Sequence, residues 1–205
     1  MARPRTHDDA VRRRLIDRAA LAISRSGPEG LSLRTVATEA STTTAAVYSL
    51  FGSREGLVAA VVEEGFRRFG AHLAAAPGSE DPVADLLALG VAYRTSALAD
   101  PHYYRAMFAP GHAVAGDVEA PGPNAAPTAG ASRAAVARPT FLALRAAVER
   151  VLRAQRREAA DAEEVALHLW SLAHGLVSLE LAGLLPGDAG ERAQRYAAAL
   201  RSMRV

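Results

Sequence analysis

Small, polar and aromatic side chains lie on one side of a helical pattern at residues 44–49. That side shows Thr44, Ala45, Tyr48 and Ser49, which offer hydroxyl and methyl groups and no charge. A threonine hydroxyl can bond a base edge or a phosphate, an alanine methyl can contact a thymine methyl, and a tyrosine hydroxyl can reach a phosphate. These side chains suit contact with double-stranded DNA if a helix carries them into the major groove.

Two short helical patterns around a polar turn would position these side chains. The first repeats apolar residues at i, i+3, i+4 and i+7, on one helix face. These residues are Leu33, Val36, Ala37 and Ala40. Ser32 is a good N-cap for this helix, residues 41–43 interrupt the pattern, and Gly52 suits the end of the second helix. Two such helices form a helix-turn-helix unit, although the spacing also fits an ordinary helical corner.

Residues 43–57, TTAAVYSLFGSREGL, resemble the recognition-helix signature of TetR-family transcriptional regulators. The matching positions are Tyr48, Phe51, Ser53, Glu55 and Leu57. The resemblance extends over about residues 8–70. Four positions depart from the usual family residues: Ser41 for glycine, Thr42 for valine, Leu50 for histidine or tyrosine, and Arg54 for lysine. The first two alter the turn, Leu50 removes a phosphate contact, and Arg54 keeps the positive charge.

The resemblance implies a homodimer that binds a palindromic DNA operator, as a repressor released by a small, largely apolar effector. It assigns base and phosphate contacts to Thr43, Thr44, Ala45, Tyr48 and Ser49. Phosphate anchors would be Ser32, Arg34 and Arg54. Dimerisation would use the last two long helices, about residues 162–185 and 188–203. A regulator without an effector, or an activator, remains compatible with the sequence.

Composition excludes several classes of protein. The 205 residues include no cysteine, so disulfides and thiol catalysis are excluded. They also include no lysine, so the positive charges at neutral pH are carried by arginine. Net charge is +2, and residues 1–60 hold nine arginines against six acidic residues, so the positive excess is N-terminal. No apolar run reaches the ~18 residues of a membrane span. We do not expect the basic N-terminus to be a signal peptide, because it lacks an apolar core. We expect a cytoplasmic protein without a cofactor.

The periodicity predicts an all-α fold with a three-helix helix-turn-helix domain followed by a helical bundle. The predicted domains are residues 8–54 for DNA binding, residues 53–76 as a connecting helix, and residues 80–205 for effector binding and dimerisation. Thr6–Asp9 reads as a capping box for the first helix, and Pro77–Ser79 as the domain boundary. We expect a long loop at 110–138, with a helix at 132–138 left open, and a helix that starts at Pro139.

An apolar effector pocket has six candidate residues. They are Tyr104, Met107, Phe108, Trp170, His174 and Val177. The first three come from a dense aromatic segment, and the others share one face of a later helix. The segment WSLAHG at 170–175 is similar to the Trp/His-Gly element of the WHG-type C-terminal domain in some TetR-like regulators. The same residues are equally consistent with ordinary core, and His174 with a hydrogen-bonded core histidine.

The alternative is an all-α enzyme or metal protein. Its candidate residues are His102, His112, His168, His174, Asp100 and Glu180. His168 and His174 are six residues apart and do not share a helix face, and no His-x-x-x-His element, phosphate loop or nucleophile elbow occurs. We therefore expect no catalytic residue and no metal site.

Overall fold

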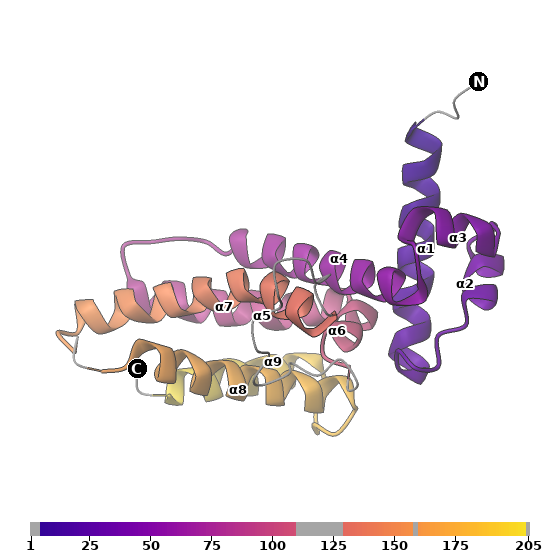
Figure 1. Ribbon diagram of the computed structural model, residues 1–205. Helices are drawn as coiled ribbons and strands as arrows, with labels where there is room; N and C mark the ends of the chain where they lie inside the picture. The colour runs from indigo at the N-terminus through magenta and orange to yellow at the C-terminus, as the bar shows by residue number, and fades with distance from the viewer. Residues whose placement is uncertain (1–4, 110–128, 158–159, 204–205) are drawn as a thin grey trace, which may run out of the picture. The chain divides into compact units, whose positions relative to one another are not determined.

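The computed structural model describes residues 5–109, 129–157 and 160–203 (Figure 1). Within these ranges every regular element is a helix, which confirms the predicted all-α class. The helices are α1 (Arg5–Ser26), α2 (Leu33–Glu39), α3 (Thr44–Phe51), α4 (Arg54–Ala74), α5 (Pro82–Ala99), α6 (Pro101–Met107), α7 (Ala129–Ala154), α8 (Ala162–Leu181) and α9 (Ala189–Ser202).

The chain forms two compact units. Unit 1 comprises Met1–Arg67 with His102–Ala137, and unit 2 comprises Arg68–Pro101 with Arg138–Val205. α4 contributes to both units, and α6 packs with the N-terminal helices. The reason lies in the side chains of α6: Tyr103 and Ala106 belong to the same buried cluster as the apolar residues of α1 to α4.

Unit 1 is built around apolar residues that each of its first four helices contributes. Leu15 of α1, Val36 of α2, Val47 of α3, and Leu57 and Val61 of α4 are almost completely buried. Burial of one such side chain stabilises the fold by roughly 1.5–3 kcal/mol. These contacts fix α2 and α3 against α1 and α4, as a helix-turn-helix requires.

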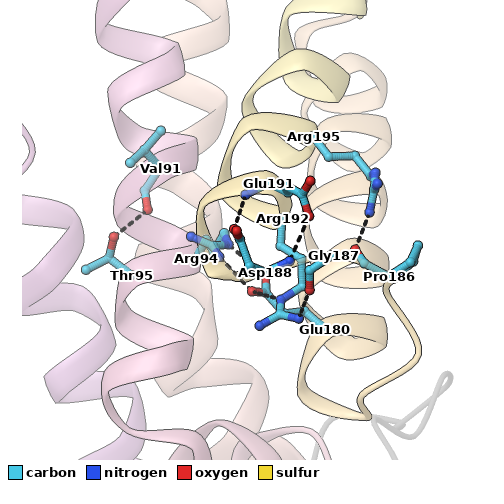
Figure 2. A network of polar contacts seen from close by, with 10 residues as sticks. All are labelled: Val91, Arg94, Thr95, Glu180, Pro186, Gly187, Asp188, Glu191, Arg192 and Arg195. Carbon is cyan, nitrogen blue, oxygen red and sulfur yellow. Dashed lines mark hydrogen bonds and ion pairs between the residues drawn. The ribbon is translucent and has the colours of Figure 1, made fainter.

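Unit 2 contains α5, α8 and α9, which lie side by side (Figure 1). The Tyr196 hydroxyl of α9 donates to the Gly90 carbonyl oxygen of α5 at 2.8 Å. A polar network joins the same helices: Arg94 of α5 and Arg192 of α9 both bind the carboxylate of Glu180 on α8 (Figure 2). The side chain of Glu180 is only 7% exposed, so this network is partly shielded from water.

Two predicted helix starts are wrong. α1 already begins at Arg5, so Thr6 is not its cap. α7 begins at Ala129 and passes through Pro139, so residues 129–138 are helical, including the segment 132–138 for which the sequence leaves a helix open. Residues 110–128 lie outside the described part of the chain. Pro139 is exposed and has no backbone N–H, so α7 continues through it with the loss of one intrahelical hydrogen bond.

None of the helices in the described ranges combines the length and the apolar composition of a membrane span. Taken together, α3 and α4 have that length and composition, but the chain bends by 66° between them.

Candidate nucleic-acid interface

The predicted helix-turn-helix is present in unit 1, and each of its helices has an N-cap. The Ser32 hydroxyl oxygen accepts a hydrogen bond from the Thr35 backbone N–H at 3.3 Å, at the start of α2. The Thr43 hydroxyl oxygen accepts one from the Ala46 N–H at 3.2 Å, at the start of α3. Each cap satisfies a backbone donor that the helix itself cannot pair. Gly52 ends α3 with a φ of 75°, as its position in the sequence predicts.

The turn between the two helices depends on Ser41. Its φ is 54°, in the left-handed region, and its N–H donates to the Thr38 carbonyl oxygen at 3.0 Å. The next N–H, of Thr42, donates to the Ala37 carbonyl oxygen at 2.9 Å. Glycine is the residue that adopts this backbone conformation without strain. The turn therefore has a left-handed conformation although a serine replaces the usual glycine.

The outer face of α3 consists of the residues that the sequence predicts to contact DNA. Tyr48 is 56% exposed, whereas its neighbour Val47 is fully buried. Ala45 and Ser49 are exposed, and Thr44 is half-buried. α3 thus presents a tyrosine ring and small side chains on a face that no described residue covers completely. The base and phosphate contacts of these residues stay a prediction.

Arg54, a predicted phosphate anchor, has a structural role that the sequence did not reveal. Its Nε donates to the Leu31 carbonyl oxygen at 3.2 Å, and its Nη2 donates to the Pro28 carbonyl oxygen. Nη1 lies 3.8 Å from the carboxylate of Glu55. The guanidinium therefore fastens the loop between α1 and α2 to the start of α4. Arg34, the other predicted anchor, is exposed on α2.

The pKa of Glu55 is lowered, chiefly by the hydrogen bond from its own backbone N–H and then by Ser53. Ser53 also caps α4, by accepting from the Gly56 N–H at 3.0 Å. A carboxylate at this place stabilises the first turn of α4 through the helix dipole.

Two arginines of α1 brace the helix-turn-helix, because they contact the ends of α2 and α3. Arg14 Nε donates to the Ala40 carbonyl oxygen, at the end of α2, at 3.2 Å. The guanidinium of Arg12 lies 5.4 Å from the ring centroid of Phe51, at the end of α3, within cation–π range. Sequence reasoning counted these arginines only as part of a basic N-terminal region. No pattern in the sequence marks them as braces, because both contacts join residues far apart in the chain.

The six pocket candidates divide between the units. In unit 1 the rings of Tyr104 and Phe108 lie 5.0 Å apart, and Met107 is buried. In unit 2 the rings of Trp170 and His174 lie 6.4 Å apart, and Val177 is fully buried. An effector pocket formed by these residues stays a prediction.

His174 has a polar partner, as a core histidine would. Its Nδ1 lies 3.1 Å from the hydroxyl of Tyr93 on α5. Burial lowers the pKa of His174, so the neutral ring is favoured.

Within the described residues, the candidates for an enzyme or a metal site do not form one cluster. His102 contacts Ser24 at 3.0 Å, Asp100 pairs with Arg68, and Glu180 pairs with Arg94. His168 is exposed on α8, and His112 lies outside the described residues. In the part of the chain that the structure describes, no three histidine or acidic side chains gather as a metal site.

Comparisons with known proteins identify the family. Residues 15–61 match the model of bacterial regulatory proteins of the tetR family, and residues 86–203 match the tetracyclin repressor-like C-terminal domain. No curated protein sequence matches the chain.

Solved structures share the fold along nearly the whole chain. A protein of unknown function from Rhodococcus sp. RHA1 is 27% identical, with a TM-score of 0.70 over 94% of this chain and 95% of its own. The TetR regulator PfmR of Thermus thermophilus is 19% identical, with a TM-score of 0.71 over 94% and 100%. AibR, solved with isovaleryl coenzyme A and operator DNA, is 18% identical, with a TM-score of 0.70 over 92% and 96%. With both family models matched, the chain belongs to the TetR family of transcriptional regulators.

Proposed function

We propose that this regulator is a cytoplasmic homodimer that represses transcription by placing α3 of each subunit in the major groove of a palindromic operator. The exposure of Tyr48 on the outer face of α3, above the fully buried Val47, carries this proposal. A helix held this firmly by its inner face can present Tyr48, Ala45 and the hydroxyl groups to base edges and phosphates without rearranging.

The surface of α8 supports the homodimer. Leu167, Ser171, Gly175 and Leu179 follow one another at i, i+4 spacing, and the two leucines are 48% and 42% exposed. The Ser171 hydroxyl donates to the Leu167 carbonyl oxygen, so it needs no other partner. A Cβ at Gly175 would meet no atom within 4 Å. Small residues between exposed leucines along an i±4 ridge let a second helix approach closely. The occupant we propose is α8 of the partner subunit.

A small, largely apolar effector would release the operator. The aromatic residues of unit 2 support it, because Trp170 and Phe141 lie 5.9 Å apart beside the polar pair of His174 and Tyr93. AibR, a structural relative, binds isovaleryl coenzyme A and operator DNA. The effector would bind more tightly to the arrangement that does not fit DNA. It can shift the equilibrium only by the difference between its binding free energies for the two states.

Fluorescence anisotropy tests the DNA function. The purified chain is titrated against the DNA that flanks its own gene and against a scrambled duplex, at two salt concentrations. We expect tight binding to the first duplex and weak, strongly salt-dependent binding to the second. Equal affinity for both duplexes would contradict a sequence-specific regulator.

A matched pair of variants locates the interface. Tyr48→Ala should weaken operator binding by about tenfold or more, since one specific contact contributes roughly 1–3 kcal/mol. Val91→Ala removes a similarly exposed apolar side chain from α5 and should leave the affinity unchanged. Equal effects of the two variants would argue against α3 as the reading helix.

A further inference from the structure

α6 is held to α1 by polar contacts at two points. The Tyr103 hydroxyl donates to Asp17 Oδ1 at 2.7 Å, and His102 Nδ1 lies 3.0 Å from the Ser24 hydroxyl. Asp17 and Ser24 are seven residues apart, so they share one face of α1 two turns from each other. The Ser24 hydroxyl also donates to the Leu21 carbonyl oxygen at 2.8 Å, within α1.

The rest of α6 is packed into unit 1 as closely as its other helices. Tyr103 is 5% exposed and Ala106 is 3% exposed, within the cluster that α1 to α4 share. Met107 lies so close to α4 that a Cβ at Gly65 would meet its Cγ at 2.6 Å. The ring of Tyr103 thus cannot move far without disturbing the core against which α2 and α3 rest.

Asp17 lies on α1 just after the two arginines that brace the helix-turn-helix. Arg14, one turn earlier, binds the Ala40 carbonyl oxygen, and Arg12 covers Phe51. Because of these two contacts, the position of α1 determines where the ends of α2 and α3 lie. A hydrogen bond that fixes α1 also fixes the recognition helix, through contacts within a single compact unit.

We propose that Tyr103 and Asp17 form a positioning pair, through which α6 holds α1, and with it α3, in the arrangement that binds the operator. Neither residue touches DNA in this role. The proposal rests on the proposed DNA function for its consequence, but the ordering of α2 and α3 can be measured without DNA.

The test uses the full chain with Tyr103→Phe, which removes only the hydroxyl. Tyr196→Phe is the matched control, because Tyr196 is 3% exposed and its hydroxyl also donates one hydrogen bond, to Gly90 in unit 2. Hydrogen exchange should become faster in residues 33–51 for Tyr103→Phe and not for Tyr196→Phe. Operator affinity should fall roughly five- to tenfold for the first variant and stay within about twofold for the second.

A second pair separates positioning from loss of stability. Asp17→Asn keeps an oxygen that accepts from Tyr103 and should retain most of the affinity, whereas Asp17→Ala should lower the affinity at least as much as Tyr103→Phe. Adding Tyr103→Phe to Asp17→Ala should cause no further loss, because Asp17→Ala already removes the acceptor of this hydrogen bond. Additive losses, or the same exchange pattern in Tyr103→Phe and Tyr196→Phe, would overturn the positioning role. If the unaltered chain binds no DNA, the proposed function fails, and the exchange comparison alone decides this inference.

Discussion

Arg54 Nε lies 3.2 Å from the carbonyl oxygen of Leu31, and this hydrogen bond joins the first residue of α4 to the loop before α2. The same guanidinium also binds Pro28 and approaches Glu55. A guanidinium has five donors in a fixed plane, so it can hold several carbonyl oxygens at once, whereas a lysine ammonium is a single point charge. At this position, where related regulators usually have lysine, the arginine stabilises the fold of the DNA-binding unit.

Arg54→Lys should therefore lower stability while it keeps the charge. We expect the free energy of unfolding to fall by about 1–2 kcal/mol, because at least one carbonyl oxygen loses its donor. Urea unfolding measures this loss. Arg34→Lys, at an exposed position on α2, is the control and should change the free energy by less than about 0.5 kcal/mol. An unchanged midpoint for Arg54→Lys would mean that the carbonyl contacts contribute nothing measurable.

Ser41→Gly should stabilise the helix-turn-helix. The φ of 54° costs a residue with a side chain about 1–2 kcal/mol, and glycine avoids this cost but loses more entropy on folding. The net gain should be roughly 0.5–1 kcal/mol in the free energy of unfolding. Ala45→Gly, inside α3, is the matched control and should destabilise by about 1 kcal/mol. Destabilisation by both changes would show that the serine side chain itself holds the turn.

The network around Glu180 should make stability depend on pH. The hydrogen bond from Arg94 is the largest cause that lowers the pKa of Glu180 below its ordinary value of 4.5, and burial opposes it. The folded state therefore prefers the ionised carboxylate. This stabilisation is fully present above pH 4.5 and is lost as the pH falls below that value through the lowered pKa.

Glu180→Gln tests this pH dependence. The variant should be less stable than the unaltered chain at neutral pH, and the difference should shrink as the pH falls below about 4.5. Thermal or urea unfolding across this range gives the measurement. Glu163→Gln removes an exposed carboxylate that lies 3.6 Å from Arg145, and it should leave the pH profile nearly unchanged. A constant difference between Glu180→Gln and the unaltered chain would contradict the assignment.

The sequence was sufficient where the signal is local. Ser32 was predicted as a cap because a cap needs only a side chain within three residues of its backbone partner, and Thr43 and Asp188 follow the same local rule. The inner faces of α2 and α3 followed from periodicity for the same reason. These local rules place the helix-turn-helix and so most of the candidate interface.

Tertiary contacts were outside the reach of that reasoning. The bracing by Arg14 and Arg54 joins residues 26 and 23 positions apart, and nothing in the spacing of either arginine distinguishes it from a solvated charge. The assignment of α6 to unit 1 depends on where Tyr103 is buried, which its neighbours in sequence do not reveal. The helix start predicted at Pro139 was wrong. A proline suits the first turn of a helix, and nothing in its own residue type shows that α7 already begins at Ala129.

The proposed dimer makes a distinct prediction at Gly175. A side chain there meets no atom of its own chain within 4 Å, so Gly175→Leu should fold normally and could even gain helix stability. If α8 of the partner lies against the ridge of Leu167, Ser171 and Leu179, the added leucine would hold the two helices apart and favour the monomer.

Light scattering coupled to size exclusion measures the subunit number of Gly175→Leu at several concentrations. Ala143→Leu, which adds a similar side chain at an exposed position of α7, is the control and should leave the dimer intact. Because a palindromic operator is bound by two subunits together, Gly175→Leu should also lose most of its operator affinity while α3 remains unaltered. A stable dimer in both variants would exclude this face of α8, and pairing would then have to use a different surface of unit 2.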